Sequence, residues 1–450
     1  MLLAAAAVGL APSPAPAVSA LRPLQTAIVD PDAFTGADAD LELGRAADAG
    51  ASVIKVPLFW DSVAPSTRPA GFTPSDPADP SYDWSAMDAE LRLLKAHGLT
   101  PLVYVASAPG WAMRTDDGVA RPDPAQLGAF TLAAVKRYSG SSGLPRVRYW
   151  EAWNEPNKVP GPAYKASAAP WYRELVNAFA QSVHSRAGNL VVAGGLAPFG
   201  VSTVVAPLAF MRSLLCLKPA CDDPVHFDVW STDPYTAGGP THHAYRPNDV
   251  SIGDLPQMKA VLDAGIAAGH VVSTQPVRFW VTEFSWDSDP PDPAGVPAKL
   301  EGRWVAEALY RMWSDGISLV TWFTIRDHPI TLSPYQSGLY YAASNPQNDR
   351  PKPALTAFRF PFVAFAQDGK ISVWGRTPLS NSTAVEVEQQ TGSGWKRVAT
   401  LDANGVGIFS SDLHTGLKGP LRAVIPEEDV TSLAFSLVRP PDAIYQPFGT

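Results

Sequence analysis

The chain has 450 residues, of which 46% are hydrophobic and 17% are charged, and its formal net charge is −8. This length exceeds what a single hydrophobic core normally holds, so we expect two or three domains. The negative balance makes nucleic acid and anionic membrane surfaces poor partners. The 14 Trp and 13 Tyr suit stacking on sugar rings, although ordinary packing explains most tryptophans in any protein.

The first 20 residues are rich in Ala and Pro and end in Val18-Ser19-Ala20. Small residues at that point predict a signal peptide over 1–20, with a disordered leader as the alternative because a positive n-region is lacking. No other stretch reaches the roughly 18 apolar residues of a membrane span. The sequence therefore predicts a secreted or cell-envelope protein, in which Cys216 and Cys221 form a small-loop disulfide. No Cys/His set has zinc-site spacing, and we expect neither a metal nor another cofactor.

Extended apolar runs alternate with helical patterns in the next part of the chain. The runs lie at 26–30, 51–60, 102–106, 148–157, 190–194, 227–231, 277–286 and 318–323. The helical patterns lie at 37–49, 85–97, 124–138, 171–186, 208–215, 254–268, 301–313 and 353–360. Eight strand-helix units predict an α/β fold, a (β/α)₈ TIM barrel over residues 21–365. An open doubly wound sheet shows the same alternation, but no Gly-rich dinucleotide fingerprint follows the first strand.

From residue 366 to 450 the pattern changes to short period-two runs separated by turn residues, such as 391–394 and 402–405. This texture predicts an antiparallel β-sandwich domain. Two roles stay open for it, packing against the barrel or binding glycan, and the first is favoured.

Two of the predicted strands end in a glutamate. The run from Arg148 ends in Asn154-Glu155 before Pro156, and the run from Val277 carries Glu283 among aromatics. Reactive groups of such barrels lie at the C-terminal ends of the strands, on one face, so the two acids are expected to converge. Glycoside hydrolysis needs such a pair, and carboxyl groups about 5 Å apart retain the anomeric configuration. A surface carboxylate and a salt-bridged strand end are the alternatives.

Trp153-Asn154-Glu155-Pro156-Asn157 together with Trp280-Val281-Thr282-Glu283 resembles the clan of retaining barrel glycosidases whose glutamates lie on strands four and seven, and most of all glycoside hydrolase family 39. The resemblance spans the whole barrel. It implies that Glu155 is the acid/base, that Glu283 is the nucleophile and that Asn154 bonds the sugar 2-hydroxyl. It also implies that Tyr235 donates to Glu283 and that Trp322 is a sugar platform, with barrel core as the alternative for Trp322.

Two positions depart from the pattern of the clan. Lys55 stands where an arginine is usual, at the matching spacing before Trp60, and Asp233 replaces a histidine. Lysine keeps the positive charge but loses the planar fork of arginine, and an extra acid can raise the pKa of a neighbour. We include all three among the substrate-binding candidates. Trp111 and Trp286 in the loops are candidate platforms, with packing as the alternative for each.

The sequence thus predicts a secreted retaining glycoside hydrolase that acts on a poly- or oligosaccharide by double displacement. A transglycosidase on the same scaffold and a non-catalytic carbohydrate-binding protein are the alternatives. The carbohydrate is the only partner that the sequence predicts.

Overall fold

The computed structural model describes residues 22–446, apart from 117, 142, 331, 332, 334, 380 and 417. The predicted signal peptide, 1–20, lies outside the described residues.

Eight parallel strands form a closed barrel, which confirms the predicted fold class. They are β1 (Gln25–Val29), β2 (Val53–Phe59), β3 (Thr100–Ala106), β6 (Tyr149–Glu151), β7 (Leu190–Ala193), β9 (Val229–Thr232), β11 (Arg278–Phe284) and β14 (Ile317–Phe323). Their order around the barrel is β1-β14-β11-β9-β7-β6-β3-β2, and β2 pairs with β1 to close it. β6 and β14, the fourth and eighth strands, therefore lie on opposite sides of the barrel.

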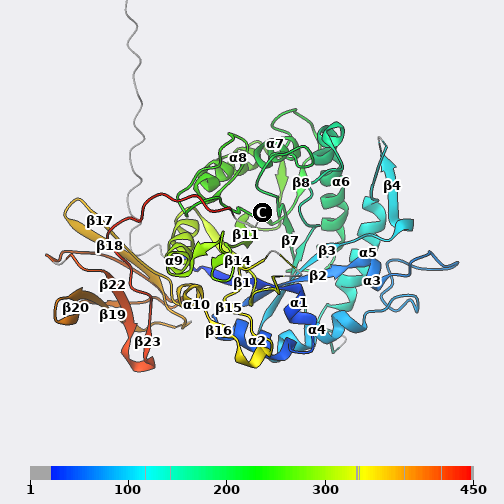
Figure 1. Cartoon of the computed structure of the whole chain (residues 1–450). Helices are drawn as coiled ribbons and strands as arrows, with labels where there is room; N and C mark the ends of the chain where they lie inside the picture. Colours follow the sequence, from blue (N-terminus) through cyan, green and yellow to red (C-terminus); the bar gives the residue numbers. More distant parts are fainter. Residues whose placement is uncertain are drawn as a thin grey trace, which may run out of the picture.

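Helices follow the strands and surround the barrel (Figure 1). They are α1 (Pro31–Thr35), α2 (Ala39–Asp48), α3 (Trp60–Val63), α4 (Ser85–Ala96), α5 (Pro124–Arg137), α6 (Lys165–Val183), α7 (Pro207–Leu214), α8 (Leu255–Ala267), α9 (Ala298–Ser314) and α10 (Pro353–Arg359). α6 begins at Lys165, before the predicted 171–186, and Pro170 lies inside the helix rather than at its start. Short pairs of strands decorate the loops: β4 (Met113–Asp116) with β5 (Val119–Pro122), β8 (Val225–His226) with β10 (Val271–Val272), β12 (Ser288–Asp289) with β13 (Val296–Pro297), and β15 (Tyr340–Tyr341) with β16 (Arg350–Pro351).

Side chains on each barrel strand alternate between two cores, because successive residues of a strand point to opposite faces. The small inner core fills the barrel, and the larger outer core lies between strands and helices. The buried members of the inner core are Ala27, Val53, Leu102, Val192, Val229, Trp280 and Leu319. These residues give the parity of each strand, which decides whether a neighbouring polar side chain can reach the mouth of the barrel.

The C-terminal part forms two antiparallel sheets beside the barrel (Figure 1). One contains β17 (Phe362–Gln367), β18 (Lys370–Arg376) and β21 (Ile408–Leu413); the other contains β19 (Ala384–Thr391), β20 (Gly394–Asp402), β22 (Leu421–Ile425) and β23 (Val430–Thr431). The predicted domain boundary at 365/366 falls inside β17. Trp374 is buried against Tyr310 and Trp313 of α9, and the Arg376 guanidinium donates to the Leu24 carbonyl. The sheets thus share a core with the barrel.

The last described segment runs from the sandwich back over the barrel (Figure 1). The Gly238 amide donates to the Tyr445 carbonyl, and the Tyr445 ring packs against Trp304 at 5.9 Å. The predicted disulfide between Cys216 and Cys221 is present. None of the helices in the described ranges is long and apolar enough to cross a membrane.

Asp228, just before β9, holds several elements together. Its carboxylate accepts hydrogen bonds from His184 after α6, from the Val191 amide of β7 and from the amide and hydroxyl of Thr274, at 2.6–2.9 Å. Burial alone would raise the pKa of Asp228, but these donors outweigh it and lower the pKa below its usual range.

We expect Asp228→Asn to lose about 2–3 kcal/mol of unfolding free energy at neutral pH, because an amide accepts fewer of these bonds. A depressed carboxyl pKa stabilises the fold above its unfolded value, and this contribution is lost as pH falls through the folded pKa. The gap between wild type and variant should therefore narrow below about pH 4 in urea titrations. Asp263→Asn, at an exposed pair with Lys259, is the control. A gap that stays constant with pH would contradict this account.

Candidate active site

A β-bulge aims Glu283 at the mouth of the barrel. On β11 the partners of Val281 and Phe284 are Val320 and Trp322, so three steps on β11 match two on β14. Trp280 points into the inner core, and without the bulge Glu283 would share the outward parity of Val281. The extra residue moves Phe284 into the outer core and turns Glu283 inward.

Glu155 reaches the mouth through an irregular turn. β6 ends at Glu151, earlier than predicted, and Glu155 lies in the loop beyond it. Trp153 and Glu155 have φ values of 71° and 46°, in the left-handed region that costs a non-glycine residue about 1–2 kcal/mol. The Glu155 amide donates to the Gly195 carbonyl at 3.0 Å, and the Tyr172 hydroxyl donates to the Ala152 carbonyl at 2.7 Å. Helix α6 and the loop after β7 thereby hold the turn in place.

A buried lysine connects the ends of strands two, four and seven. Lys55 shares the inward parity of Val53, and its ammonium lies 3.4 Å from Glu151, 3.8 Å from Glu283 and 3.2 Å from the Asn154 side-chain oxygen. Burial would lower the pKa of Lys55, but the surrounding carboxylates, Glu151 first, raise it above its usual range. Lys55 is therefore a permanent cation beneath the mouth. Its side chain points into the barrel and not toward the helices or solvent.

Tyr235 and Asp233 follow β9 and differ in their relation to Glu283. The Tyr235 hydroxyl donates to Glu283 Oε1 at 2.6 Å. Asp233 is fully buried and accepts a hydrogen bond from the Thr282 hydroxyl at 2.9 Å. The prediction that Asp233 contacts the substrate is therefore wrong. Burial raises the pKa of Asp233 well above its usual range, Lys55 opposes this, and Glu283 adds to it. Burial thus disfavours the charged form of Asp233, which lies under the floor of the site.

The two glutamates act on each other electrostatically. Burial raises the pKa of Glu283; Lys55 and the hydrogen bond from Tyr235 lower it, and the charge of Glu155 raises it again. The net direction is upward, whereas the mechanism expected from the sequence calls for a normal or low pKa at this residue. Glu155 itself forms an ion pair with Lys158, whose pKa rises because Glu155 and Glu283 outweigh the effect of burial. The ends of strands four and seven therefore meet at one mouth.

Two of the predicted tryptophan platforms, Trp322 and Trp286, are wrong, and so is the substrate-binding role expected of Trp60, because all three rings are fully buried. Trp322 lies in the outer core and donates to the Ser337 carbonyl; Trp286 donates to the Thr236 and Gly238 carbonyls. Trp60 stacks on Phe130 at 5.1 Å. The physical reason for Trp322 is parity: Leu319 and Thr321 occupy the inward positions of β14, so Trp322 faces the helices.

Trp111 is partly buried under a loop, where it donates to the Pro65 carbonyl and meets Trp60 edge-on. This contact fits the packing alternative.

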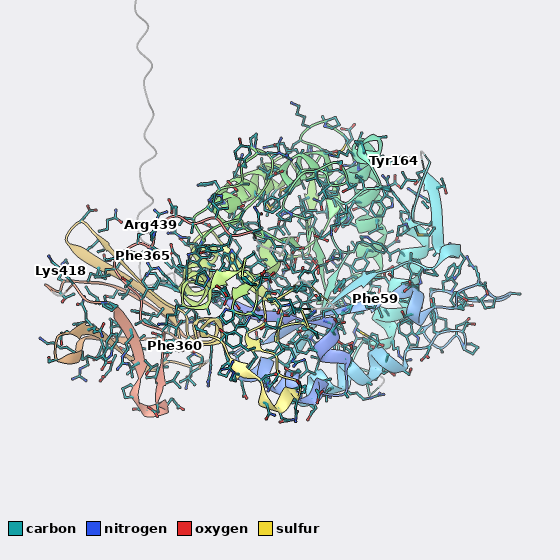
Figure 2. All side chains as sticks on the ribbon, in the orientation of Figure 1. Phe59, Tyr164, Phe360, Phe365, Lys418 and Arg439 are labelled. Carbon is teal, nitrogen blue, oxygen red and sulfur yellow. A yellow bond between two sulfur atoms is a disulfide. The ribbon has the colours of Figure 1, made fainter. Side chains whose placement is uncertain are left out.

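Sequence reasoning missed four residues of the mouth. Phe59 at the end of β2 is 42% exposed and lies on the barrel, far from the sandwich marked by Lys418 (Figure 2). Glu151 has the inward parity of Tyr149, which was the available signal for it. Lys158 and Tyr335 come from loops, and no strand pattern predicts where loops fold.

Among the described residues no group of three or more His, Cys, Asp or Glu is arranged to hold a metal ion. His242 and His243, adjacent in the loop after strand six, are not part of such a group: His243 forms a hydrogen bond with Asp254 at 2.8 Å.

No protein-family model and no curated protein matches the sequence. Among solved structures the chain is similar to a family 39 glycoside hydrolase from the gut symbiont Bacteroides cellulosilyticus WH2, with a TM-score of 0.55, 16% identity, and coverage of 88% of this chain and 81% of that one. It is also similar to SrfJ from Salmonella typhimurium, with a TM-score of 0.50, 9% identity, and coverage of 88% and 91%. At these identities the likeness shows the fold, a TIM barrel with a β-sandwich, which is the fold that the sequence predicts.

We expect Lys55→Met to destabilise the protein by about 3 kcal/mol, because it leaves buried carboxylates without their cation. Adding Glu151→Gln should recover much of that loss, since the amide removes the uncompensated charge. Urea unfolding of both single variants and the double variant completes the cycle. Lys136→Met, which removes an exposed lysine bonded to the Ser75 carbonyl, is the control. Independent effects of the two substitutions would show that the pair is not coupled.

Proposed function

We propose that the protein is a retaining O-glycosidase that cleaves a poly- or oligosaccharide by double displacement. The observation that carries this proposal is the contact of Lys55 with both Glu283, at 3.8 Å, and Asn154, the residue before Glu155, at 3.2 Å, together with the hydrogen bond from Tyr235 to Glu283. Lys55 and Tyr235 stabilise the charge of Glu283, the group that has to attack, against burial, which raises its pKa, and Glu155 is left for proton transfer.

In the first step Glu283 attacks the anomeric carbon and the bond to the leaving oxygen breaks. Glu155 gives its proton to that oxygen, so the leaving group departs as an alcohol and the sugar stays bound to Glu283 as an ester. Lys158 forms an ion pair with Glu155. The leaving group therefore has to displace this ammonium before Glu155 can act as an acid.

In the second step Glu155 takes a proton from water, and the hydroxide oxygen attacks the anomeric carbon from the face that the leaving group left. The ester bond to Glu283 breaks, and the configuration is retained after two inversions. Asn154, whose side-chain oxygen accepts a hydrogen bond from Lys55, binds the sugar 2-hydroxyl in this proposal. Phe59 supplies an exposed aromatic face at the rim.

We also propose that the protein is exported. The disulfide between Cys216 and Cys221 supports this, because such bonds persist in oxidising compartments.

Glu283→Ala should lower hydrolysis of aryl glycosides by about 10⁴-fold, because the covalent step is lost. Azide should restore turnover and yield a glycosyl azide of the opposite anomeric configuration, since the anion enters the space of the missing carboxylate. Product configuration is read by NMR. Glu174→Ala, at a surface carboxylate paired with Arg114, should behave as wild type. Full activity of Glu283→Ala would refute the assignment.

Glu155→Ala should separate substrates by the acidity of their leaving groups. Glycosides with good leaving groups need no proton in the first step, so the variant should still release them in a burst before slow hydrolysis. Natural oligosaccharides with poor leaving groups should be cleaved at least about 10³-fold more slowly than by wild type. Comparable losses on both classes would assign the proton transfer to another residue.

A further inference from the structure

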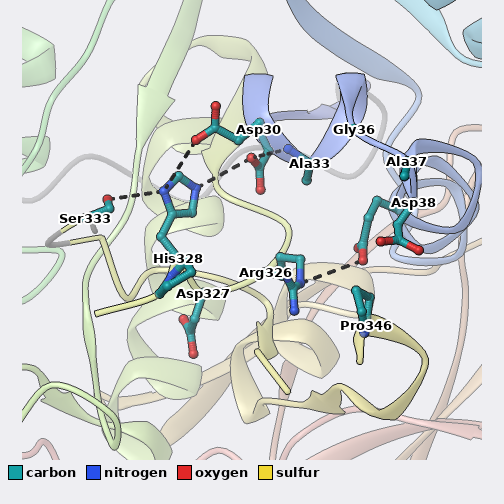
Figure 3. A pocket seen from close by; sticks show the side chains of 13 residues that line it. Asp30, Ala33, Gly36, Ala37, Asp38, Arg326, Asp327, His328, Ser333 and Pro346 are labelled. Atoms are coloured by element: carbon teal, nitrogen blue, oxygen red, sulfur yellow. Dashed lines mark hydrogen bonds and ion pairs between the residues drawn. The ribbon is translucent and has the colours of Figure 1, made fainter. Parts of the chain in front are cut away.

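A cavity of about 260 Å³ opens beside the mouth, at the C-terminal ends of β1 and β14 (Figure 3). Asp30 and Asp32 line it from the end of β1, Glu42 from α2, and Arg326 and His328 from the segment after β14. Neither of the proposed catalytic glutamates contributes to its wall. The cavity thus lies on the catalytic face but next to the site described above.

Arg326, a cation of the wall, is neutralised by an acid outside the cavity, and Asp327, an acid of the wall, is neutralised by a lysine outside it. Asp30, Asp32 and Asp38 also line the wall. Arg326 donates to both oxygens of Asp349, at 2.8 and 3.1 Å, and the Lys352 ammonium binds Asp327. The surplus of charge in the cavity is therefore carboxylate.

Asp30 and Asp32 share one basic neighbour, the imidazole of His328. It lies 3.6 Å from Asp30 and 3.9 Å from Asp32, as the dashed lines in Figure 3 indicate. The pKa of His328 is raised. The largest cause is its bond to Asp30; burial opposes the rise, and the charges of Asp30 and Asp32 add to it. One imidazole thus faces both of these carboxylates, so the wall favours a cationic ligand.

Glu42 presents an acceptor that no described residue satisfies. Its side chain is 1% exposed, Oε1 accepts from Arg45 at 2.8 Å, and Oε2 is buried without a hydrogen-bond partner among the described residues. Burial raises the pKa of Glu42 to about 7, with Arg45 and Arg326 opposing it. Buried acceptors are nearly always paired in native proteins, so an unpaired one that lines a cavity points to a ligand that donates.

Aromatic rings join the cavity to the mouth. The His328 imidazole packs edge-on against Tyr335 at 5.9 Å, and Tyr335 packs against Phe323 of β14 at 4.9 Å. The pKa of Tyr335 is raised by burial and then by the charge of Glu283. Tyr335 is therefore a neighbour of both the cavity wall and Glu283.

The position of the cavity sets its side of the scissile bond. Glu155 follows β6, which lies across the barrel from β14. An acid protonates the leaving oxygen, so the leaving group lies on the side of β6 and the rest of the sugar chain extends toward β14 and β1. The cavity is on this second side.

We propose that the cavity binds one hexosamine unit with a free ammonium group, on the glycone side of the sugar that is cleaved. Its volume lies below the roughly 300 Å³ at which pockets for drug-sized ligands begin, which suits one monosaccharide. The ammonium binds among Asp32, Asp30 and Glu42, and a donor of the sugar satisfies Glu42 Oε2. This inference rests on the proposed function and specifies its substrate class, a cationic polysaccharide with de-N-acetylated hexosamine.

The test measures binding without turnover, so that its failure is distinct from failure of the catalytic proposal. The full chain carrying Glu155→Gln is titrated by calorimetry with the β-1,4 trisaccharides of glucosamine, of N-acetylglucosamine and of glucose. The glucosamine trisaccharide should bind about tenfold tighter than the other two, because only it carries the ammonium groups that charge-assisted bonds require.

Asp32→Asn and Glu42→Gln, added singly, should each remove most of this preference. Asp40→Asn, on the same helix as Glu42 but paired outside the cavity with His97, should leave it unchanged. Asp32 is 86% exposed, so its variant keeps the test valid even if Glu42→Gln fails to fold. Equal affinity for the three sugars would overturn the amino-sugar assignment. If the preference survives Asp32→Asn, and also Glu42→Gln where that variant folds, the amino-sugar site does not lie in this cavity.

Discussion

The buried ammonium of Lys55 is the interaction on which the site depends. An isolated charge inside a protein costs several kcal/mol, so Lys55 is tolerable only with anionic partners around it. Those partners are Glu151 at the end of β6 and Glu283 on β11, with Asp233 after β9 close enough to raise its pKa. Strands two, four, six and seven are therefore held in the register that brings their C-terminal ends together. The same cation then favours the ionised form of the proposed nucleophile.

The barrel departs from regular strand structure at both points where the chemistry is proposed. Strict alternation on β11 would point Glu283 toward the helices, and the bulge after Val281 reverses this. At the end of β6 the chain leaves the strand and passes through left-handed residues at Trp153 and Glu155. Such conformations persist only when neighbours fix them, and here Gly195 and Tyr172 supply those bonds. Helix α6 and the loop after β7 therefore hold Trp153 and Glu155 in their strained conformation.

The sequence predicts the eight-unit barrel, the sandwich, the disulfide, and the convergence of strands four and seven, because each depends on periodicity or spacing. The tryptophan platforms failed because composition does not reveal parity: Trp322 lies one residue from an inward position and is core. Parity was available for Lys55, two residues after Val53, and for Glu151, two after Tyr149. The cavity beside β1 was beyond reach, because it depends on how the 30–42 and 326–346 segments fold against each other.

The two sides of the mouth differ in the sign of their charge, and this difference bears on the direction in which a sugar chain would lie. Lys158, with a side chain 57% exposed, stands beside Glu155 on the β6 side, and the acidic cavity stands on the β14 and β1 side. A cationic unit is repelled by the first and attracted by the second, so a substrate of mixed charge has one favourable direction across Glu283. The ion pair of Lys158 adds to this, since a leaving group that draws the ammonium away frees Glu155 for proton transfer. Orientation and catalysis would then be coupled through the same lysine.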